Sequence, residues 1–179
     1  AGLVKYEIKD NESIENSLTG TSGNPIKGRV LSVNRKKGNC LACHQMPIPE
    51  QSFHGNIGPS LVGAGERYSI GELRLRVVNP KIVNEDTIMP AFYRNSGFTR
   101  TLKKFAGKTI LSAQEVEDII SYVTMLGEMY SIKSGDTLSQ IAQTHSTSLA
   151  NIITLNPKFA SEPGKIDVGQ EIVLPAKSN

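Results

Sequence analysis

The sequence predicts a mainly α-helical fold in two domains, a larger helical domain over residues 1–128 and a small β-α-α-β domain over residues 129–179. Two observations support this prediction. Apolar residues recur at helical spacing before Gly127, and beyond it two runs of strand character flank two short helical patterns. A chain of 179 residues is long enough for two small domains.

The first domain begins with a polar segment over residues 1–25, in which turn-forming residues predict an extended arm. Apolar spacing over 26–35 predicts a short amphipathic helix. The stretch 47–65 is rich in Gly and Pro and predicts loops. A second helix is expected over 69–78, where Asn79-Pro80 ends it.

The most regular helix of the chain is expected after Ser112. Ser112 can cap its first turn, and Glu115 three residues later completes a capping box. We expect Gly127 to end this helix. Its apolar positions recur every three or four residues, at Val116, Ile119, Ile120, Val123 and Leu126.

The pentapeptide Cys40-Leu41-Ala42-Cys43-His44 is the attachment signal for a c-type haem. Each thiol can form a thioether to a haem vinyl group, and His44 then lies under the iron. A disulfide, a redox pair and half a zinc site are the alternatives. A zinc site would need a second pair of ligands, but the chain has no further Cys and His54 and His145 are isolated. A redox pair usually opens a helix after a strand, and this motif does not follow a predicted strand. We therefore predict one covalent haem c.

The second axial ligand is expected from Met89, which lies in a loop 45 residues after His44 with Pro90 behind it. Such a His/Met pair raises the reduction potential and suits an electron carrier. The Gly58-Pro59 turn is expected to accept the Nδ1 proton of His44. Met46 is too close to His44 to reach the far face. The other candidate ligands are Met125, Met129, His54 and His145.

The haem motif also indicates a compartment. Attachment of this kind belongs to an oxidising, extracytoplasmic space, which predicts a periplasmic protein. Because the sequence starts at Ala1 and not at Met, we expect that a secretory signal was removed. No stretch approaches the ~20 apolar residues of a membrane helix. The formal charge of +3 is a modest surplus that suits either an acidic partner surface or an ordinary solvated surface, and it falls short of a nucleic-acid footprint.

Several short segments surround the haem motif and form a specific combination. They are Leu18-Thr19-Gly20, Gly28-Arg29, Gly38-Asn39 before the motif, Gly55-Asn56-Ile57-Gly58-Pro59-Ser60-Leu61, Asn79-Pro80 and Ile88-Met89-Pro90-Ala91-Phe92. By these segments, residues 12–127 resemble SoxX, a monohaem cytochrome c family with the class I cytochrome c layout. The resemblance implies that Cys40 and Cys43 hold the haem and that His44 and Met89 bind its iron.

The resemblance also implies a function. SoxX is the electron-transfer subunit of the SoxAX complex, an L-cysteine S-thiosulfotransferase. There the partner cytochrome SoxA joins thiosulfate oxidatively to a cysteine of the carrier protein SoxYZ, and SoxX passes the electrons to a downstream cytochrome. The chain shows no nucleophile or acid/base constellation of its own, so we expect the redox half of an enzyme with no catalytic residue and no activity alone.

The last part of the chain combines Gly135-Asp136-Thr137-Leu138, Ile141-Ala142, Asn156-Pro157 and a Gly-Gln-x-Ile-x-x-Pro motif that starts at Gly169. By these motifs residues 130–175 resemble a LysM module, with strands expected near 130–133 and 171–175 and helices near 138–144 and 148–155. LysM modules bind N-acetylglucosamine glycans such as peptidoglycan through two loops. An alternative is that Gly135 and Asp136 serve only the turn and the helix cap. The loop residues are Gly135, Asp136 and Thr137, then Ile153, Thr154, Leu155, Asn156 and Pro157.

The role of the LysM module and the function of the whole chain both have alternatives. The module is either a peptidoglycan tether or a clamp between SoxX and SoxA, and the resemblance does not separate the two. The whole chain could instead be a general periplasmic electron carrier, or a cell-wall binding protein with an accessory haem. In each case the short junction Gly127-Glu128-Met129 predicts that the two domains touch.

Overall fold

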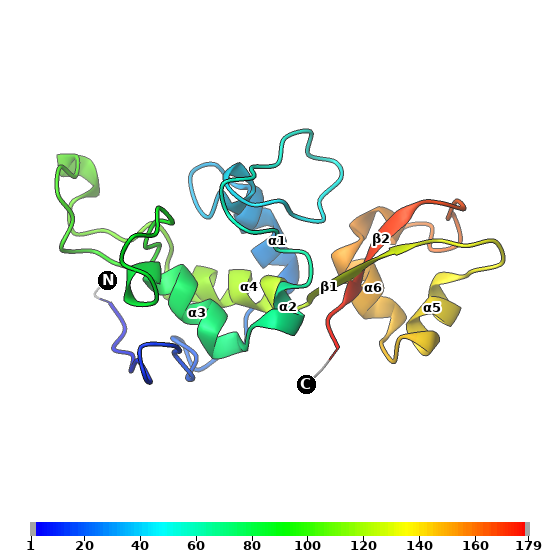
Figure 1. Cartoon of the computed structure of the whole chain (residues 1–179), viewed down its shortest axis with the longest axis horizontal. Coiled ribbons are helices and arrows are strands. Elements are labelled where there is room, and N and C mark those ends of the chain that lie inside the picture. Colours follow the sequence, from blue (N-terminus) through cyan, green and yellow to red (C-terminus); the bar gives the residue numbers. More distant parts are fainter. Residues whose placement is uncertain (1–2, 178–179) are drawn as a thin grey trace.

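The computed structural model describes residues 3–177 as two lobes that lie side by side along the long axis of the molecule (Figure 1). The helical lobe contains α1 (Pro25–Val33), α2 (Ala64–Arg67), α3 (Ile70–Val78) and α4 (Ala113–Val123). The second lobe contains β1 (Leu126–Ser131), α5 (Leu138–Thr144), α6 (Leu149–Leu155) and β2 (Glu171–Pro175). Short 3-10 turns lie at Cys40–Ala42, Pro80–Ile82, Lys103–Phe105 and Pro157–Phe159.

Helices α1 and α4 pack directly against each other in the helical lobe. Gly28 permits this close approach, because a Cβ at this position would lie 1.9 Å from the carbonyl oxygen of Asp118 and 2.9 Å from Cβ of Tyr122. On α4, Ile119 and Ile120 are 1% exposed, as the apolar spacing of this helix predicts, and Tyr122 is also fully buried. The predicted amphipathic stripe is therefore the centre of the core.

Helix α4 begins where the sequence predicts. The Ser112 hydroxyl accepts a hydrogen bond from the backbone N–H of Glu115, and the Glu115 carboxylate accepts one from the N–H of Ser112. Helix α3 has an equivalent box at Ser69 and Glu72, which the sequence reasoning did not identify. Each box satisfies backbone donors that the first turn of a helix leaves unpaired.

The predicted end of α4 at Gly127 is wrong. The helix ends at Val123, and Leu126 already belongs to a strand that pairs with Pro175. Strand β1 therefore starts four residues before the predicted strand at Tyr130. The cause is tertiary, because the residues that pair with Leu126 lie some fifty positions further along the chain.

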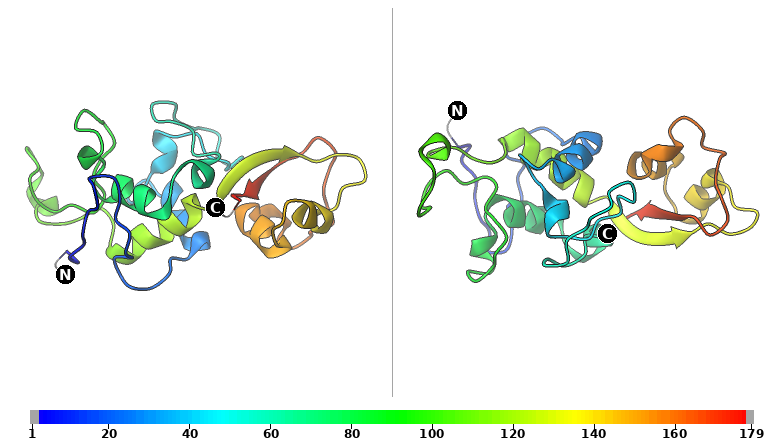
Figure 2. Two further views of the ribbon diagram at one scale, coloured as in Figure 1. Left: turned by 60° about the horizontal axis from the view of Figure 1, so that its bottom comes forward. Right: turned by 90° about the horizontal axis from the view of Figure 1, so that it is seen from above.

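The second lobe is an antiparallel pair of strands with two short helices packed on it (Figure 2). Met129 pairs with Val173 and Tyr130 with Ile172, and the register shifts between Leu126 and Met129. The lobe has its own apolar core, which consists of Ile132, Leu138, Ile141, Ala142, Ile152, Phe159, Ile172 and Leu174.

The two lobes share a packed interface, as the short junction predicts. Leu155 and Val173 come from the second lobe but belong to the core of the helical lobe. Backbone hydrogen bonds join Gly63 N–H to the Gly127 carbonyl at 2.8 Å and Ala176 N–H to the Met125 carbonyl at 2.9 Å. The predicted domain boundary at 128/129 lies inside β1.

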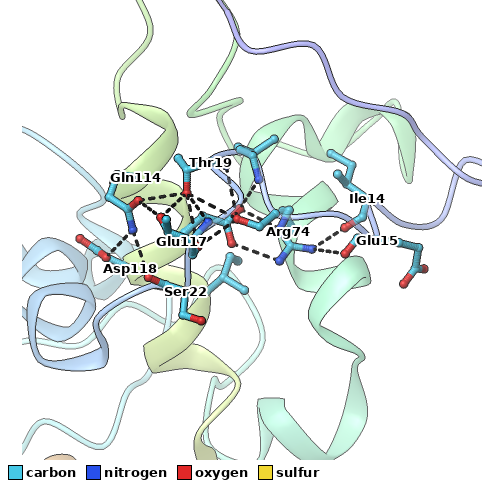
Figure 3. Close-up of polar contacts among 12 residues, drawn as sticks. Ile14, Glu15, Thr19, Ser22, Arg74, Gln114, Glu117 and Asp118 are labelled. Carbon is cyan, nitrogen blue, oxygen red and sulfur yellow. Dashed lines mark hydrogen bonds and ion pairs between the residues drawn. The ribbon is translucent and has the colours of Figure 1, made fainter.

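The N-terminal arm is fastened to α3 and α4 by a buried ion pair (Figure 3). Arg74 contacts Glu117 twice, with Nε–Oε1 at 2.9 Å and Nη2–Oε2 at 3.1 Å, and both side chains are buried. Glu117 also accepts the N–H of Leu18, while Arg74 donates to the carbonyls of Ile14 and Glu15. The pair thereby satisfies backbone groups of an arm that has no helix of its own. Within residues 3–177, no helix has the length and apolar character needed to cross a bilayer.

Candidate functional site

The haem motif lies on a single 3-10 turn, Cys40–Ala42, that follows α1. The turn begins after Asn39, whose left-handed backbone (φ 47°) suits Asn better than most residues. The backbone N–H groups of Cys43 and His44 both donate to the carbonyl of Cys40, at 3.1 and 2.8 Å. Two free thiols and one imidazole are thus displayed by one rigid turn.

The imidazole of His44 is held by the turn that follows it in the chain. Its Nδ1 lies 2.6 Å from the carbonyl oxygen of Pro59, the contact expected of the Gly58-Pro59 turn. A carbonyl oxygen only accepts, so Nδ1 carries the proton and Nε2 keeps its lone pair for a metal. The Gly58 N–H donates to the Cys43 carbonyl at 2.8 Å, which fixes this turn against the motif.

Gly58 packs against the imidazole ring itself. A Cβ at this position would lie 2.4 Å from Cε1 of His44, so no larger residue fits without moving the ring. From the sequence, Gly58 is expected only as part of the turn, and its contact with the ring is not predicted. The one signal for it was a glycine placed directly before Pro59.

Met89 lies in a loop that is anchored at both ends. Before it, Lys81 Nζ donates to the carbonyls of Glu85 and Thr87 at 2.8 and 2.6 Å. After it, the Phe92 N–H donates to the Val77 carbonyl of α3 at 3.1 Å. Met89 is half-buried and packs against the core of the helical lobe. Lys81 and its two bonds were not predicted.

The other candidate ligands occupy less suitable positions. Met46 is buried in the core, Met125 follows α4 and Met129 lies on β1 in the second lobe. His54 uses both ring nitrogens, because Nδ1 accepts the N–H of Met46 at 3.2 Å and Nε2 donates to the Gln51 carbonyl at 3.0 Å. Binding a metal would cost His54 one of these bonds.

The donor set fits a covalently bound haem better than a redox dithiol. Burial raises the pKa of the Cys40 thiol to about 11, although a hydrogen bond to Ser32 acts in the opposite direction. Thiol–disulfide enzymes need a lowered thiol pKa, so Cys40 is not tuned for exchange. The loops beside His44 and Met89 also expose Ile57 and Ile88, apolar side chains that a large flat ring would cover.

The first of the two predicted glycan-binding loops lies after β1. Gly135 is exposed and has a positive φ of 86°, which the turn requires. Asp136 Oδ2 accepts the N–H of Lys133 and the hydroxyl of Tyr130, both at 2.8 Å, and these bonds lower the pKa of Asp136. Thr137 caps α5 through the N–H of Gln140. Each of the three thus has a role in the turn or the cap.

The second loop corrects two expectations. The Leu155 side chain is 1% exposed and lies in the core. Asn156 is buried, with Nδ2 donating to the carbonyls of Ile152 and Val173 and Oδ1 accepting the N–H of Val173. Asn156 holds α6 against β2, Leu155 packs into the core shared with the helical lobe, and neither side chain is open to a ligand. Ile153 and Thr154 are half-buried and Pro157 is exposed, so these three remain available at the surface.

Comparison with known proteins identifies both parts of the chain. The family model described as cytochrome c matches residues 27–127, and the LysM domain model matches residues 130–175. A chain in the crystal structure of SoxXA from P. pantotrophus is 38% identical with a TM-score of 0.64, and the match covers 70% of this chain and 97% of that one. An endolysin of Bacillus phage PZA is 46% identical over 43 residues, which are 24% of this chain and 16% of the endolysin. The predicted pair of folds is confirmed.

Proposed function

The chain belongs to the cytochrome c family, as a SoxX-like cytochrome followed by a LysM domain, and from this we propose that it is the electron-transfer subunit of a SoxAX-type L-cysteine S-thiosulfotransferase. The observation that supports the proposal most strongly is the match to the SoxXA structure over 97% of the matched chain. The oriented imidazole of His44 agrees with it.

In this proposal Cys40 and Cys43 attach the haem, while His44 and Met89 bind its iron. The bound haem supplies reversible transfer of one electron. Residues of the chain would keep both iron ligands in place. Pro59 holds the His44 ring through Nδ1, Gly58 lets that ring pack against the turn because it has no Cβ, and Lys81 fixes the loop that would present Met89.

The sulfur chemistry has to occur elsewhere. Both cysteines of the chain belong to the haem motif, so the thiol that receives thiosulfate comes from another protein, in this proposal SoxYZ. Joining a thiol to thiosulfate forms a sulfur–sulfur bond, releases the thiol proton and releases two electrons. One haem stores one electron, so the chain would pass electrons from a SoxA-type subunit to a downstream cytochrome in successive steps.

We assign the LysM domain to cell-wall binding and place the protein in the periplasm, where peptidoglycan and c-type haem coexist. The residues accessible to a glycan are Gly135 and Thr137 in the first loop and Ile153, Thr154 and Pro157 in the second loop. The shared core at Leu155 and Val173 also favours a second role, in which the domain stiffens the cytochrome lobe for contact with SoxA.

Reconstitution tests the redox function. The haem-loaded chain is mixed with a SoxA-type subunit, SoxYZ and thiosulfate, and reduction of an added cytochrome is followed. We expect a stable complex and reduction that requires every component. A control with both motif cysteines changed to alanine should give neither haem nor reduction. A haem-loaded chain that is redox-active but insensitive to thiosulfate would point to the general electron carrier.

Sedimentation with purified peptidoglycan tests the second domain. We expect retention that chitin oligomers compete away and that Ile153→Asp weakens, with Val168→Asp as the matched control at an exposed position outside the two loops. Equal retention of both variants would exclude these loops. Circular dichroism of each variant shows whether the domain remains folded.

A further inference from the structure

A loop over residues 94–110, here called the basic loop, projects from the helical lobe at the end opposite the second lobe (Figures 1 and 2). Its base is closed by Phe92, whose carbonyl accepts the N–H groups of Ile110 and Leu111 at 3.1 and 3.0 Å. The 3-10 turn Lys103–Phe105 lies within it. It is therefore a defined protrusion with a fixed base, and no element of the proposed haem site uses it.

The basic loop contains the whole positive surplus of the protein. It holds five of the 20 Lys and Arg residues, and no Asp or Glu lies between Asp86 and Glu115. The rest of the chain has 15 basic and 17 acidic residues. In the described part of the chain none of the five is ion-paired with a carboxylate. The five are Arg94, Arg100, Lys103, Lys104 and Lys108.

Large apolar side chains alternate with these cations and are open to solvent. Phe98 is 46% exposed, Leu102 65%, Phe105 55% and Ile110 42%. Two cations lie over aromatic rings of the loop, Arg94 5.0 Å from the Phe98 centroid and Lys104 4.9 Å from that of Phe105. Apolar groups surrounded by unpaired cations are typical of a surface that a partner covers, and the cations require that partner to be acidic.

The position of the loop indicates which kind of partner. Its base at Phe92 lies three residues after Met89, and the Phe92 N–H anchors the Met89 loop to α3. A protein docked on the basic loop would thus sit beside the Met89 side of the proposed haem site. Opposite charges there would also speed the encounter. An anionic membrane fits the same chemistry but would cover this side with lipid and keep a redox partner away.

We propose that the basic loop is the docking surface for an acidic face of the SoxA-type cytochrome subunit. The identity of the partner rests on the proposed function, whereas the chemistry of the surface rests on the loop alone. Phe105 and Leu102 supply the apolar centre of the contact, and Lys103 and Lys104 beside them supply the charge.

The test measures the affinity of the haem-loaded full chain for the SoxA-type subunit by calorimetry, at about 50 mM and about 300 mM salt, a range over which exposed charge pairs become screened. We expect Lys103→Glu with Lys104→Glu to weaken binding at least about tenfold at low salt and less at high salt. Phe105→Ser should weaken binding at both salt concentrations, because it removes an apolar contact. The matched control reverses two exposed lysines of the second lobe, Lys158→Glu with Lys165→Glu, and should bind as the wild type does.

Three results would overturn the inference in different ways. If the wild type binds and the loop variants bind equally well, the docking surface is wrong and the proposed function stands. If the wild type does not bind the subunit at either salt concentration, the partner and with it the proposed function are wrong. If the loop variants lose only their binding to vesicles that contain phosphatidylglycerol, the loop is a membrane contact.

Discussion

Gly58 lies so close to the ring of His44 that a Cβ on it would be 2.4 Å from Cε1 and 2.6 Å from Nδ1. The same ring donates from Nδ1 to the Pro59 carbonyl. One turn therefore fixes both the position and the protonated nitrogen of the imidazole, which is how outer contacts commonly tune a metal ligand.

Gly58→Ala should displace the His44 ring. Because the added methyl group must push the imidazole away, the bond to Pro59 should lengthen and the imidazole should lose its orientation. We expect a shifted reduction potential and an altered haem spectrum in the loaded protein. Gly164→Ala is the control, since a Cβ there meets nothing within 4 Å. An unchanged potential in Gly58→Ala would show that the ring has room.

Met89→Ala should abolish the sulfur-to-iron charge-transfer band at the red end of the oxidised spectrum and lower the reduction potential. The reason is that a thioether ligand stabilises the reduced iron. Met129→Ala, on β1 in the second lobe, should leave both unchanged. If the band persists in Met89→Ala, the ligand lies elsewhere in the chain.

Glu117→Gln should destabilise the helical lobe by about 3–5 kcal/mol, because it leaves the Arg74 charge buried without its partner. Urea unfolding measures the loss. A double variant, Arg74→Met with Glu117→Leu, removes both charges and should recover part of that stability. A loss below about 1 kcal/mol in Glu117→Gln would mean that water reaches the pair.

Glu115 should contribute to the stability of α4 only above acidic pH. Burial raises the pKa of its carboxyl, but the ion pair with Lys37 at 2.8 Å and the Ser112 bonds outweigh this and lower it below 4.5. A lowered pKa means stability that is present above the unfolded pKa and lost as pH falls through the folded one. Wild type should exceed Glu115→Gln in unfolding free energy at pH 7, and the gap should close on acidification. A gap that does not change with pH would exclude the charged contribution.

Gly65→Ala should loosen the joint between the lobes. A Cβ at Gly65 would lie 2.0 Å from the carbonyl oxygen of Thr124 and 2.8 Å from Cβ of Ala176. We expect the wild type to unfold in one transition and the variant in two, with Gly164→Ala again as the control. A single transition in Gly65→Ala would show that the interface tolerates the displacement.

Features fixed by neighbouring residues were predictable from sequence, and those fixed by distant ones were not. The capping box of Ser112 and Glu115 and the Pro59 contact of His44 involve residues close in the chain, and both appear as expected. The end of α4 was missed because Leu126 pairs with Pro175. Leu155 and Asn156 were wrongly assigned to a glycan-binding loop. Their burial depends on contacts with the helical lobe and with β2, which lie far away in the sequence.

The charge of the basic loop could have been found from sequence, since a run from residue 87 to residue 114 without Asp or Glu is visible in the printed chain. The net charge of the first domain concealed it, because the acidic residues before and after the loop offset part of its charge. Its exposure and its closed base needed the structure.

The backbone hydrogen bonds of Gly127 and Met125, together with the shared core, hold the two lobes in one relative orientation. If the LysM lobe is bound to the cell wall, the cytochrome lobe keeps a fixed orientation and cannot move independently toward redox partners. Redox partners would have to diffuse to the cytochrome lobe, so the turnover rate would depend on their diffusion and on the surface density of the wall-bound protein. Inserting a flexible linker at the junction would change that dependence and leave the chemistry of the haem as it is.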